Sequence, residues 1–294
     1  PNEFLFHLGN PQVYTGLEIN AIKNNFDKVS INVCLVFPDT YEIGMSHHGI
    51  KILYHRLNSF PNINAERCFL PEKGSIEVFK QFNQPLFSIE NKVPLKEFDI
   101  IGFSILSELN YTNVLQVLEL SQIPLKSSDR SQGFPLIIAG GISVVNPEPL
   151  RDYIDVFGIG DGEVIFPDLI EVISASKKYN LSRDQILEKI DKIEGIYVPS
   201  RYQVKKGQNF YYPHLKSKKI KKRTVNNIEE SFPDENIIVP LGSAVFNRLD
   251  VEIARGCPQT CRFCQAKSYY SPFRVKSVKK SVKFIKKALG ETGF

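Results

Sequence analysis

The sequence predicts an α/β protein with a doubly wound parallel sheet, followed by the start of a second α/β domain. Between residues 30 and 176, short and almost wholly apolar segments alternate with segments whose apolar residues recur at helical spacing. Strands without polar alternation are typical of parallel sheets that helices cover on both faces. After residue 237 a similar pattern begins again and leads into a group of three cysteines.

Five strands are expected in the first region: Ile31–Phe37, Ala65–Leu70, Asp99–Ile105, Leu136–Ala139 and Val156–Ile159. Helices are expected between them, with apolar faces on Ile50–Leu57, Val114–Ser121 and Leu169–Ile173. Because βαβ crossovers are right-handed, these elements form a Rossmann-like sheet that binds ligands beyond the carboxyl ends of its strands. The loops at residues 38–49, 104–108, 140–143 and 158–163 are expected at that edge.

The domain organisation predicted from these patterns has four parts. Residues 1–29 are an N-terminal extension, 30–176 the sheet domain, 177–236 a basic connector, and 237–294 the start of a second domain. The segment 201–223 holds nine Lys or Arg and no Asp or Glu, and we interpret it as a β-ribbon or linker. Its basic residues alternate with Tyr202, Phe210, Tyr211 and Tyr212, so an RNA-binding strip is the alternative.

The second domain begins with an expected strand at Val251–Ala254 that leads into the cysteines. A helix follows, with Val278, Val282, Ile285 and Leu289 on one face and lysines on the other. One such βα unit uses roughly 30 residues and cannot bury a core alone. We therefore expect the chain to stop inside this domain.

The composition excludes several classes of protein. Hydrophobic residues make up 42% and charged residues 23%, which excludes a disordered or collagen-like chain. No apolar run reaches the roughly 18 residues that a membrane helix needs, so we expect no membrane segment and a cytoplasmic location. Five cysteines are an odd number and argue against a disulfide framework. Cys34 and Cys68 lie in apolar segments and are expected to be buried thiols.

The remaining cysteines, Cys257, Cys261 and Cys264, form a CxxxCxxC motif on one short loop. A structural zinc site needs four ligands, and the nearest upstream histidine, His214, precedes the end of the basic segment. Three thiolates suit an iron–sulfur cluster that leaves one iron open to another ligand. A redox CxxC pair would leave the third cysteine unexplained. Two alternatives stay open: a module that is stabilised by zinc and binds RNA, and a domain that only senses a ligand.

This motif, with Phe263 before the last cysteine and Glu252–Gly256 before the first, resembles the start of a radical S-adenosylmethionine (SAM) enzyme. The resemblance implies that the three cysteines bind a 4Fe–4S cluster whose fourth iron chelates SAM. An electron from a flavodoxin- or ferredoxin-like donor then cleaves SAM to a 5′-deoxyadenosyl radical. Phe263 would pack near the adenine. The family's barrel has about six βα units, so the chain by itself is expected to be inactive. No substrate is implied.

The sheet domain carries a second resemblance, to the cobalamin-binding domain that often precedes a radical SAM barrel. Asp39, Tyr41 and Gly44 match DxHxxG with tyrosine in place of histidine, and the matches to SxL and GG are Ser104, Leu106, Gly140 and Gly141. In that family the histidine ligates cobalt, and a tyrosine cannot supply a neutral imidazole nitrogen. Cobalamin binding without a protein ligand on cobalt therefore stays open.

Other polar residues of the same loops receive more ordinary roles. His47 and His48 are expected to cap or pack the following helix rather than to ligate a metal. The carboxylates Glu42, Glu108, Asp161 and Glu163 are interpreted as loop caps and turn residues without a catalytic role. Together with residues 37–46 and 146–149, residues 158–163 resemble an uncharacterised family of radical SAM proteins with a cobalamin-type domain.

Overall fold

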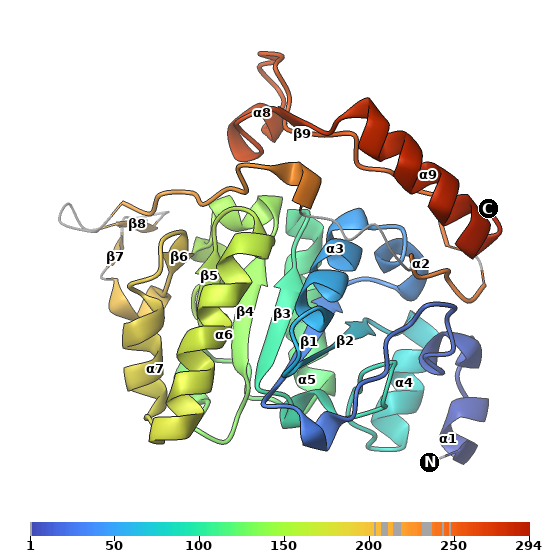
Figure 1. Ribbon diagram of the computed structural model, residues 1–294. Coiled ribbons are helices and arrows are strands. Elements are labelled where there is room, and N and C mark those ends of the chain that lie inside the picture. Colours follow the sequence, from blue (N-terminus) through green and yellow to red (C-terminus); the bar gives the residue numbers. More distant parts are fainter. Residues whose placement is uncertain are drawn as a thin grey trace.

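The computed structural model describes residues 2–202, 204–206, 211–213, 219–230, 237–242, 244–246 and 248–294. A six-stranded sheet with the order β2-β1-β3-β4-β5-β6 lies at its centre (Figure 1). The strands are β1 Ile31–Phe37, β2 Ile63–Phe69, β3 Ile100–Ser104, β4 Leu136–Gly140, β5 Val156–Gly158 and β6 Ile196–Tyr197. The first five are parallel, and β6 runs antiparallel to β5. The doubly wound parallel sheet and its five predicted strands are therefore confirmed.

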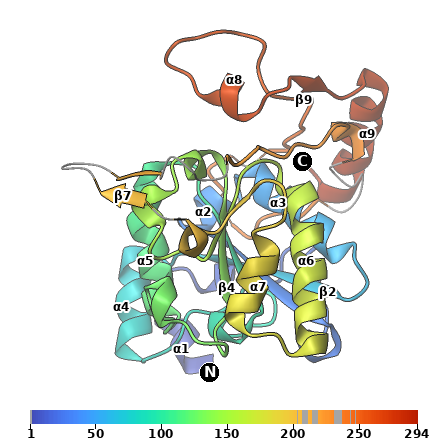
Figure 2. The ribbon, with the colours of Figure 1, turned by 90° about the vertical axis from the view of Figure 1, so that its left-hand side faces the viewer.

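Helices cover both faces of this sheet (Figure 2). Helices α3 (His48–Asn58) and α6 (Gly162–Tyr179) lie on one face, and α4 (Lys73–Gln81) and α5 (Tyr111–Leu120) lie on the other. Every residue of β1, β2 and β3 is buried between these layers. A strand buried on both faces needs apolar side chains on both, which explains the continuous hydrophobic runs in the sequence.

The order of β2, β1 and β3 creates a switch point in the sheet. The chain leaves β1 toward β2 through α3 and returns to β3 through α4, so the two crossovers lie on opposite faces. In sheets of this kind the loops diverge beyond the carboxyl ends of the central strands and leave room for a ligand. The fold therefore places the loops after β1, β3, β4 and β5 at one edge.

The sheet domain extends further than the sequence indicates. The predicted boundary at residue 176 lies inside α6, and α7 (Arg183–Ile190) and β6 follow before the sheet is complete. Strand β6, which ends at Tyr197, is hydrogen-bonded to β5 in the same sheet. Helix α7 is rich in charged residues and β6 has only two residues, so neither produces a strong periodic signal.

The N-terminal extension covers the edge strand β2. It comprises α1 (Asn2–Phe6) and a short 3-10 turn at Pro11–Tyr14, and Phe4 packs edge-to-face on Phe79 of α4 with ring centroids 4.8 Å apart. Strand β2 buries the polar side chains of Asn64, Glu66 and Arg67 completely. The extension therefore protects an edge that carries polar groups, a common way to prevent further strand pairing.

Within the segment interpreted as a connector, β7 (Val204–Lys206) pairs antiparallel with β8 (Tyr211–Pro213). Residues 203, 207–210, 214–218 and 231–236 lie outside the described residues, so Phe210 and His214 do too. After the connector the chain returns to the N-terminal extension, where Val239 forms an antiparallel bridge with Ile19.

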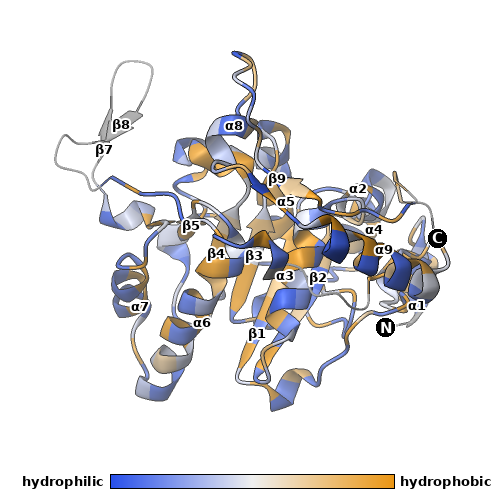
Figure 3. Cartoon of the chain, turned by 45° about the horizontal axis from the view of Figure 1, so that its top comes forward, coloured by the Kyte–Doolittle hydropathy of each residue, from blue (hydrophilic) through white to orange (hydrophobic). Residues whose placement is uncertain are grey.

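The C-terminal region crosses above the carboxyl edge of the sheet (Figures 1 and 3). It contains β9 (Ala254–Arg255), α8 (Ala266–Tyr269), β10 (Arg274–Val275) and α9 (Val278–Thr292). The predicted helix is confirmed by α9, but the predicted strand over Val251–Ala254 is wrong except at its last residue. Strand β9 pairs antiparallel with β10 in a separate two-stranded sheet.

The remaining regular segments are short. Helix α2 spans Tyr41–Gly44, directly after β1. Further 3-10 turns lie at Phe26–Lys28, Leu95–Glu97, Glu108–Asn110, Ser127–Asp129, Ile142–Val145, Glu148–Leu150, Pro199–Arg201 and Ile228–Glu230. Among the helices in the described residues, we find none with the length and hydropathy that a bilayer crossing requires.

Candidate functional site

A cavity of about 410 Å³ lies beyond the carboxyl ends of the central strands, under the C-terminal segment. This volume falls in the range of small-molecule sites, about 300–1,000 Å³. Its floor is apolar and consists of Leu35, Phe103, Ile138, Ile165, Phe166 and Leu169. Residues of β9 and α8 complete the lining from the other side. The cavity is therefore shared by the sheet domain and the C-terminal region.

Glycines bring the backbone close to this cavity. Gly141 has a φ of +109°, and a Cβ there would collide with the carbonyl oxygen of Ile105. Gly160 has a φ of +133°, and a Cβ there would collide with the carbonyl oxygen of Arg223. Only glycine suits both the positive φ and the close approach. These two glycines therefore keep the strand ends β4 and β5 tight against their neighbours.

The seven residues predicted for a cobalamin-type pocket separate into two groups. Ser104, Leu106, Gly140 and Gly141 line the cavity. Asp39, Tyr41 and Gly44 are absent from its lining, and each has another contact. An oxygen of Asp39 accepts a hydrogen bond from the Thr40 amide at 2.9 Å, and Gly44 packs against Phe69.

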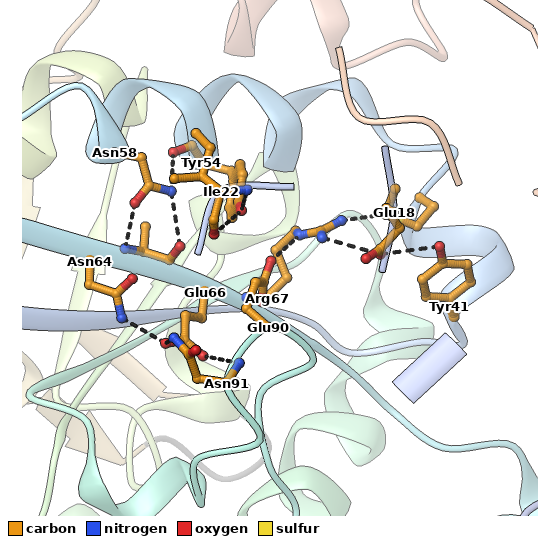
Figure 4. Close-up of polar contacts among 12 residues, drawn as sticks. Glu18, Ile22, Tyr41, Tyr54, Asn58, Asn64, Glu66, Arg67, Glu90 and Asn91 are labelled. Carbon is orange, nitrogen blue, oxygen red and sulfur yellow. Dashed lines mark hydrogen bonds and ion pairs between the residues drawn. The ribbon is translucent and has the colours of Figure 1, made fainter. Parts of the chain in front are cut away.

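Tyr41 belongs to a buried polar network instead (Figure 4). Its hydroxyl donates to Glu18 Oε1 at 3.2 Å and accepts from the Leu241 amide at 2.9 Å. Glu18 in turn pairs with Arg67 at 3.1 Å, and Arg67 pairs with Glu90 at 2.7 Å. Burial raises the pKa of the Tyr41 hydroxyl, so it stays protonated and can donate. Tyr41 therefore joins the N-terminal extension, the sheet domain and the segment that follows the connector.

The two neighbouring histidines do line the cavity. His47 is the N-cap of α3, and its Nδ1 accepts from the Ile50 amide at 3.4 Å, which confirms the expected capping role. Burial lowers the pKa of His47 to about 4 and that of His48 to about 4. Both imidazoles are therefore neutral at pH 7.

A group of buried ion pairs forms the polar side of the cavity. Arg255 Nη2 contacts Glu163 Oε1 at 2.8 Å and its Nε contacts Glu252 Oε1 at 2.8 Å. Asp161 contacts both Arg255 and Arg274. Burial raises the pKa of Glu163, and the nearby Arg255 partly offsets this effect. The interpretation of Asp161 and Glu163 as turn residues is therefore incomplete, because their carboxylates hold the C-terminal region.

The sequence contained only part of the signal for these ion pairs. The segment containing Asp161 and Glu163 was expected at the carboxyl edge, and Arg255 stood beside the cysteine motif. Tyr269 and Tyr270, which line the cavity, and Arg274, which pairs with Asp161, were missed, because only the path of the loop after the cysteines brings them there. The other two carboxylates, Glu42 and Glu108, are absent from the cavity lining.

The three cysteines lie on one loop that projects away from the sheet (Figure 1). Cys257 is half-buried, whereas Cys261 and Cys264 are exposed, and Phe263 is 91% exposed. Within the described residues, no three His, Cys, Asp or Glu side chains gather closely enough to hold a metal ion. The donors are thiols, which fit an iron–sulfur cluster chemically, but here they do not converge on a common centre. Cys34 and Cys68 are buried free thiols, as predicted.

Several basic groups of the connector make contacts within the protein. Arg201 pairs with Asp184 at 2.7 Å, Lys221 with Glu194 at 3.3 Å, and Arg223 with Asp168. Lys222 Nζ donates to the carbonyl oxygens of Ser268, Tyr269 and Ser271 at 2.6–3.1 Å. These contacts favour the interpretation of the segment as a structural connector, because they attach it to the sheet domain and to the loop after the cysteines.

Comparisons with known proteins point to one group. A family model described as "Radical SAM proteins, N-terminal" matches residues 49–199. An uncharacterized protein of Methanocaldococcus jannaschii is 24% identical over 255 residues, which cover 85% of this chain and 44% of that protein. The chain therefore spans less than half the length of this relative. No solved structure shows a significant match.

Proposed function

Because the chain belongs to the family of radical SAM N-terminal domains, we propose that it is part of an enzyme that binds a 4Fe–4S cluster and SAM. The observation that carries this proposal is the cysteine motif on an exposed loop, attached by buried ion pairs to the sheet domain. When bound, such a cluster supplies one electron for the reductive cleavage of SAM. The substrate of the enzyme is left unassigned.

The residues of this chain would have separate tasks. Cys257, Cys261 and Cys264 would supply three thiolate ligands and leave one iron for SAM. Phe263 is 91% exposed, so its ring is available to pack on the SAM adenine. Since the thiols do not converge in this structure, the loop has to rearrange when it takes up the cluster.

Anaerobic reconstitution of the complete natural protein with iron and sulfide tests this proposal. We expect about four irons and four sulfides per chain, with absorbance near roughly 400 nm. Cys257→Ala should lose the chromophore, whereas Cys34→Ala, a buried thiol outside the loop, should keep it. One tightly bound zinc per chain, with no iron–sulfur chromophore, would instead support the module stabilised by zinc.

We propose that the cavity receives the nucleotide portion of a corrinoid against the glycine-rich strand ends, because a volume of about 410 Å³ is too small for the whole ligand. Ser104, Leu106, Gly140 and Gly141 line the cavity, and this supports the proposal. Tyr41 is engaged with Glu18 and is absent from the cavity lining, so cobalt would receive no ligand from that position. If the complete protein, expressed with cobalamin, shows no corrin absorbance after purification, this part of the proposal fails.

We further propose a flavodoxin- or ferredoxin-like electron donor and a location in the reducing cytoplasm. The donor follows from the cluster, because a plant-type ferredoxin has a reduction potential near −400 mV and can supply an electron at low potential. The location follows from the need of such a cluster for a reducing environment. The test is reduction of the reconstituted protein by each purified donor. If neither donor bleaches the chromophore, the proposed partner class is wrong.

A further inference from the structure

The cysteine loop, residues 256–273, leaves and rejoins the body of the protein at a narrow neck. Strands β9 and β10 form this neck, and Arg255 and Arg274 are direct partners in their antiparallel register. Like charges directly opposite each other in a sheet are destabilising unless a counter-ion compensates them. The two guanidinium groups therefore need acidic partners, and Arg255 has Glu163 and Glu252 among its own.

Asp161 supplies an acidic partner to both from the sheet domain. Its Oδ1 lies 3.1 Å from Arg255 Nη1, and its Oδ2 lies 2.6 Å from Arg274 Nη1. The side chains of Asp161, Arg255 and Arg274 are only 8%, 9% and 6% exposed. One carboxylate thus holds both strands of the neck, each through a different oxygen.

The surroundings keep this carboxylate in place. Asp161 stands between β5 and α6, and its amide donates to the carbonyl of Arg223 at 2.9 Å. Its Oδ2 also accepts from the Val225 amide at 2.9 Å. Arg274 Nη1 additionally donates to the Val225 carbonyl at 2.6 Å. The carboxylate is therefore positioned by the sheet domain and the connector, independently of the loop.

The neck lies next to the first cysteine. Gly256 follows Arg255 with a φ of +93°, and a Cβ there would lie 2.7 Å from the Tyr270 carbonyl oxygen. Just before Cys257 the chain thus turns tightly against the backbone at Tyr270, near the other end of the loop. Cys257 is half-buried, whereas Cys261 and Cys264, farther along the loop, are exposed. The position of Arg255 therefore determines the position of Cys257, which is two residues farther along the chain.

We propose that Asp161 is a positioning residue for the cysteine loop, which closes the neck through Arg255 and Arg274 and thereby places Cys257. The sheet domain would in this way orient the first ligand of the metal site. The inference rests on the proposed function for the identity of the metal. The closure of the neck is a property of the metal-free protein and is tested separately.

The test is the rate at which iodoacetamide alkylates each cysteine of the complete, metal-free natural protein, measured by mass spectrometry. In Asp161→Ala we expect alkylation of Cys257 to rise about tenfold, equivalent to roughly 1.4 kcal/mol of local opening. The alkylation rates of Cys261 and Cys264 should change little, because both thiols are already exposed. In Asp161→Asn the alkylation rate of Cys257 should lie between those of Asp161→Ala and the wild type. Asp161→Glu should bring the rate back close to that of the wild type.

Two controls separate positioning from general destabilisation. Cys34 and Cys68 are 0% and 1% exposed, so they report unfolding of the sheet domain within the same sample. Asp184→Asn removes an acidic group of α7 that pairs with Arg201, and it should leave the alkylation rate of Cys257 as in the wild type. If Asp161→Ala does not fold, Arg274→Gln opens the neck from its other strand and should give the same pattern.

The possible results are distinct. Selective exposure of Cys257, with Cys34 and Cys68 protected, supports the proposal. An unchanged alkylation rate of Cys257 overturns the proposal. So does a simultaneous rise in the alkylation rates of Cys257, Cys34 and Cys68. Iron and sulfide uptake is measured in parallel: a wild type that takes up no cluster contradicts the proposed function, whatever the alkylation pattern of the neck.

Discussion

Tyr41 stands where the resemblance to cobalamin-binding domains expects a histidine, and its contacts predict a structural role. The side chain is 4% exposed and its hydroxyl joins Glu18 and the amide of Leu241. Replacing Tyr41 with Phe removes only the hydroxyl. Replacing it with His restores the residue of the resembling family but shortens the side chain.

The size of the effect follows from these contacts. In Tyr41→Phe the Leu241 amide loses its acceptor, while Glu18 keeps its ion pair with Arg67. An unsatisfied buried group costs about 1–3 kcal/mol, so we expect a loss of that size in the free energy of unfolding. Tyr41→His should cost more, about 2–4 kcal/mol, because it also reduces packing on Phe69.

Urea denaturation and hydrogen exchange of the complete protein measure these changes. The amide of Leu241 should exchange faster in both variants, since Tyr41 is its acceptor. Tyr41→His should not create a nitrogen ligand for cobalt, because position 41 is absent from the cavity lining. Unchanged exchange at Leu241, or a histidine-ligated corrinoid spectrum in Tyr41→His, would refute this reasoning.

Three further predictions concern the sheet domain. Gly141→Ala should destabilise the protein by about 1–3 kcal/mol in urea titrations, because φ is +109° and the new methyl group meets a backbone carbonyl; an unchanged midpoint would contradict this. Arg67→Met should cost about 3–5 kcal/mol, because it leaves two buried carboxylates without their cation; a stability equal to wild type would show that they are otherwise compensated. Burial lowers the pKa of His47, His48 and His55 to about 4 each, so the unfolded chain binds more protons than the folded one between pH 6.5 and 4. Stability should therefore fall as the pH drops through this window, by about 1–2 kcal/mol per histidine at pH 5, and His55→Gln should reduce that slope; an identical slope would argue against its titration.

The central sheet was predictable because its strands are buried on both faces. β1 is a run of apolar residues with a single amide, Asn32, so it cannot be mistaken for a surface segment. The turns after β3 and β4 were equally visible through Ser104 and Gly140–Gly141. These short-range signals placed the carboxyl edge of the sheet and four residues of the cavity.

The parts that depend on distant contacts were not predictable from the pattern. Strand β2 contains buried Glu66 and Arg67, which are stable there only because Glu90, Asn91 and Glu18 reach them from other segments. Likewise, no local pattern indicates that one carboxylate at position 161 meets two arginines more than 90 residues later. Such pairs become visible only when the fold brings the segments together.

The cysteine loop was predictable only in part. Its motif identified the candidate metal ligands, but the strand expected before it is replaced by the two-residue pair of β9 and β10. The ion pairs of Arg255 with Asp161 and Glu163 attach this region to the sheet domain. The sequence therefore offers candidate metal ligands, whose role stays a prediction, but it did not indicate how the loop is attached.

We propose above that the three loop thiolates bind a cluster with one iron open to SAM. The most direct measurement is the electron paramagnetic resonance spectrum of the anaerobically reconstituted and reduced complete protein, recorded without and with SAM. We expect a reduced-cluster signal that changes when SAM is added and is absent in Cys264→Ala. A fully assembled cluster whose spectrum does not respond to saturating SAM would contradict it.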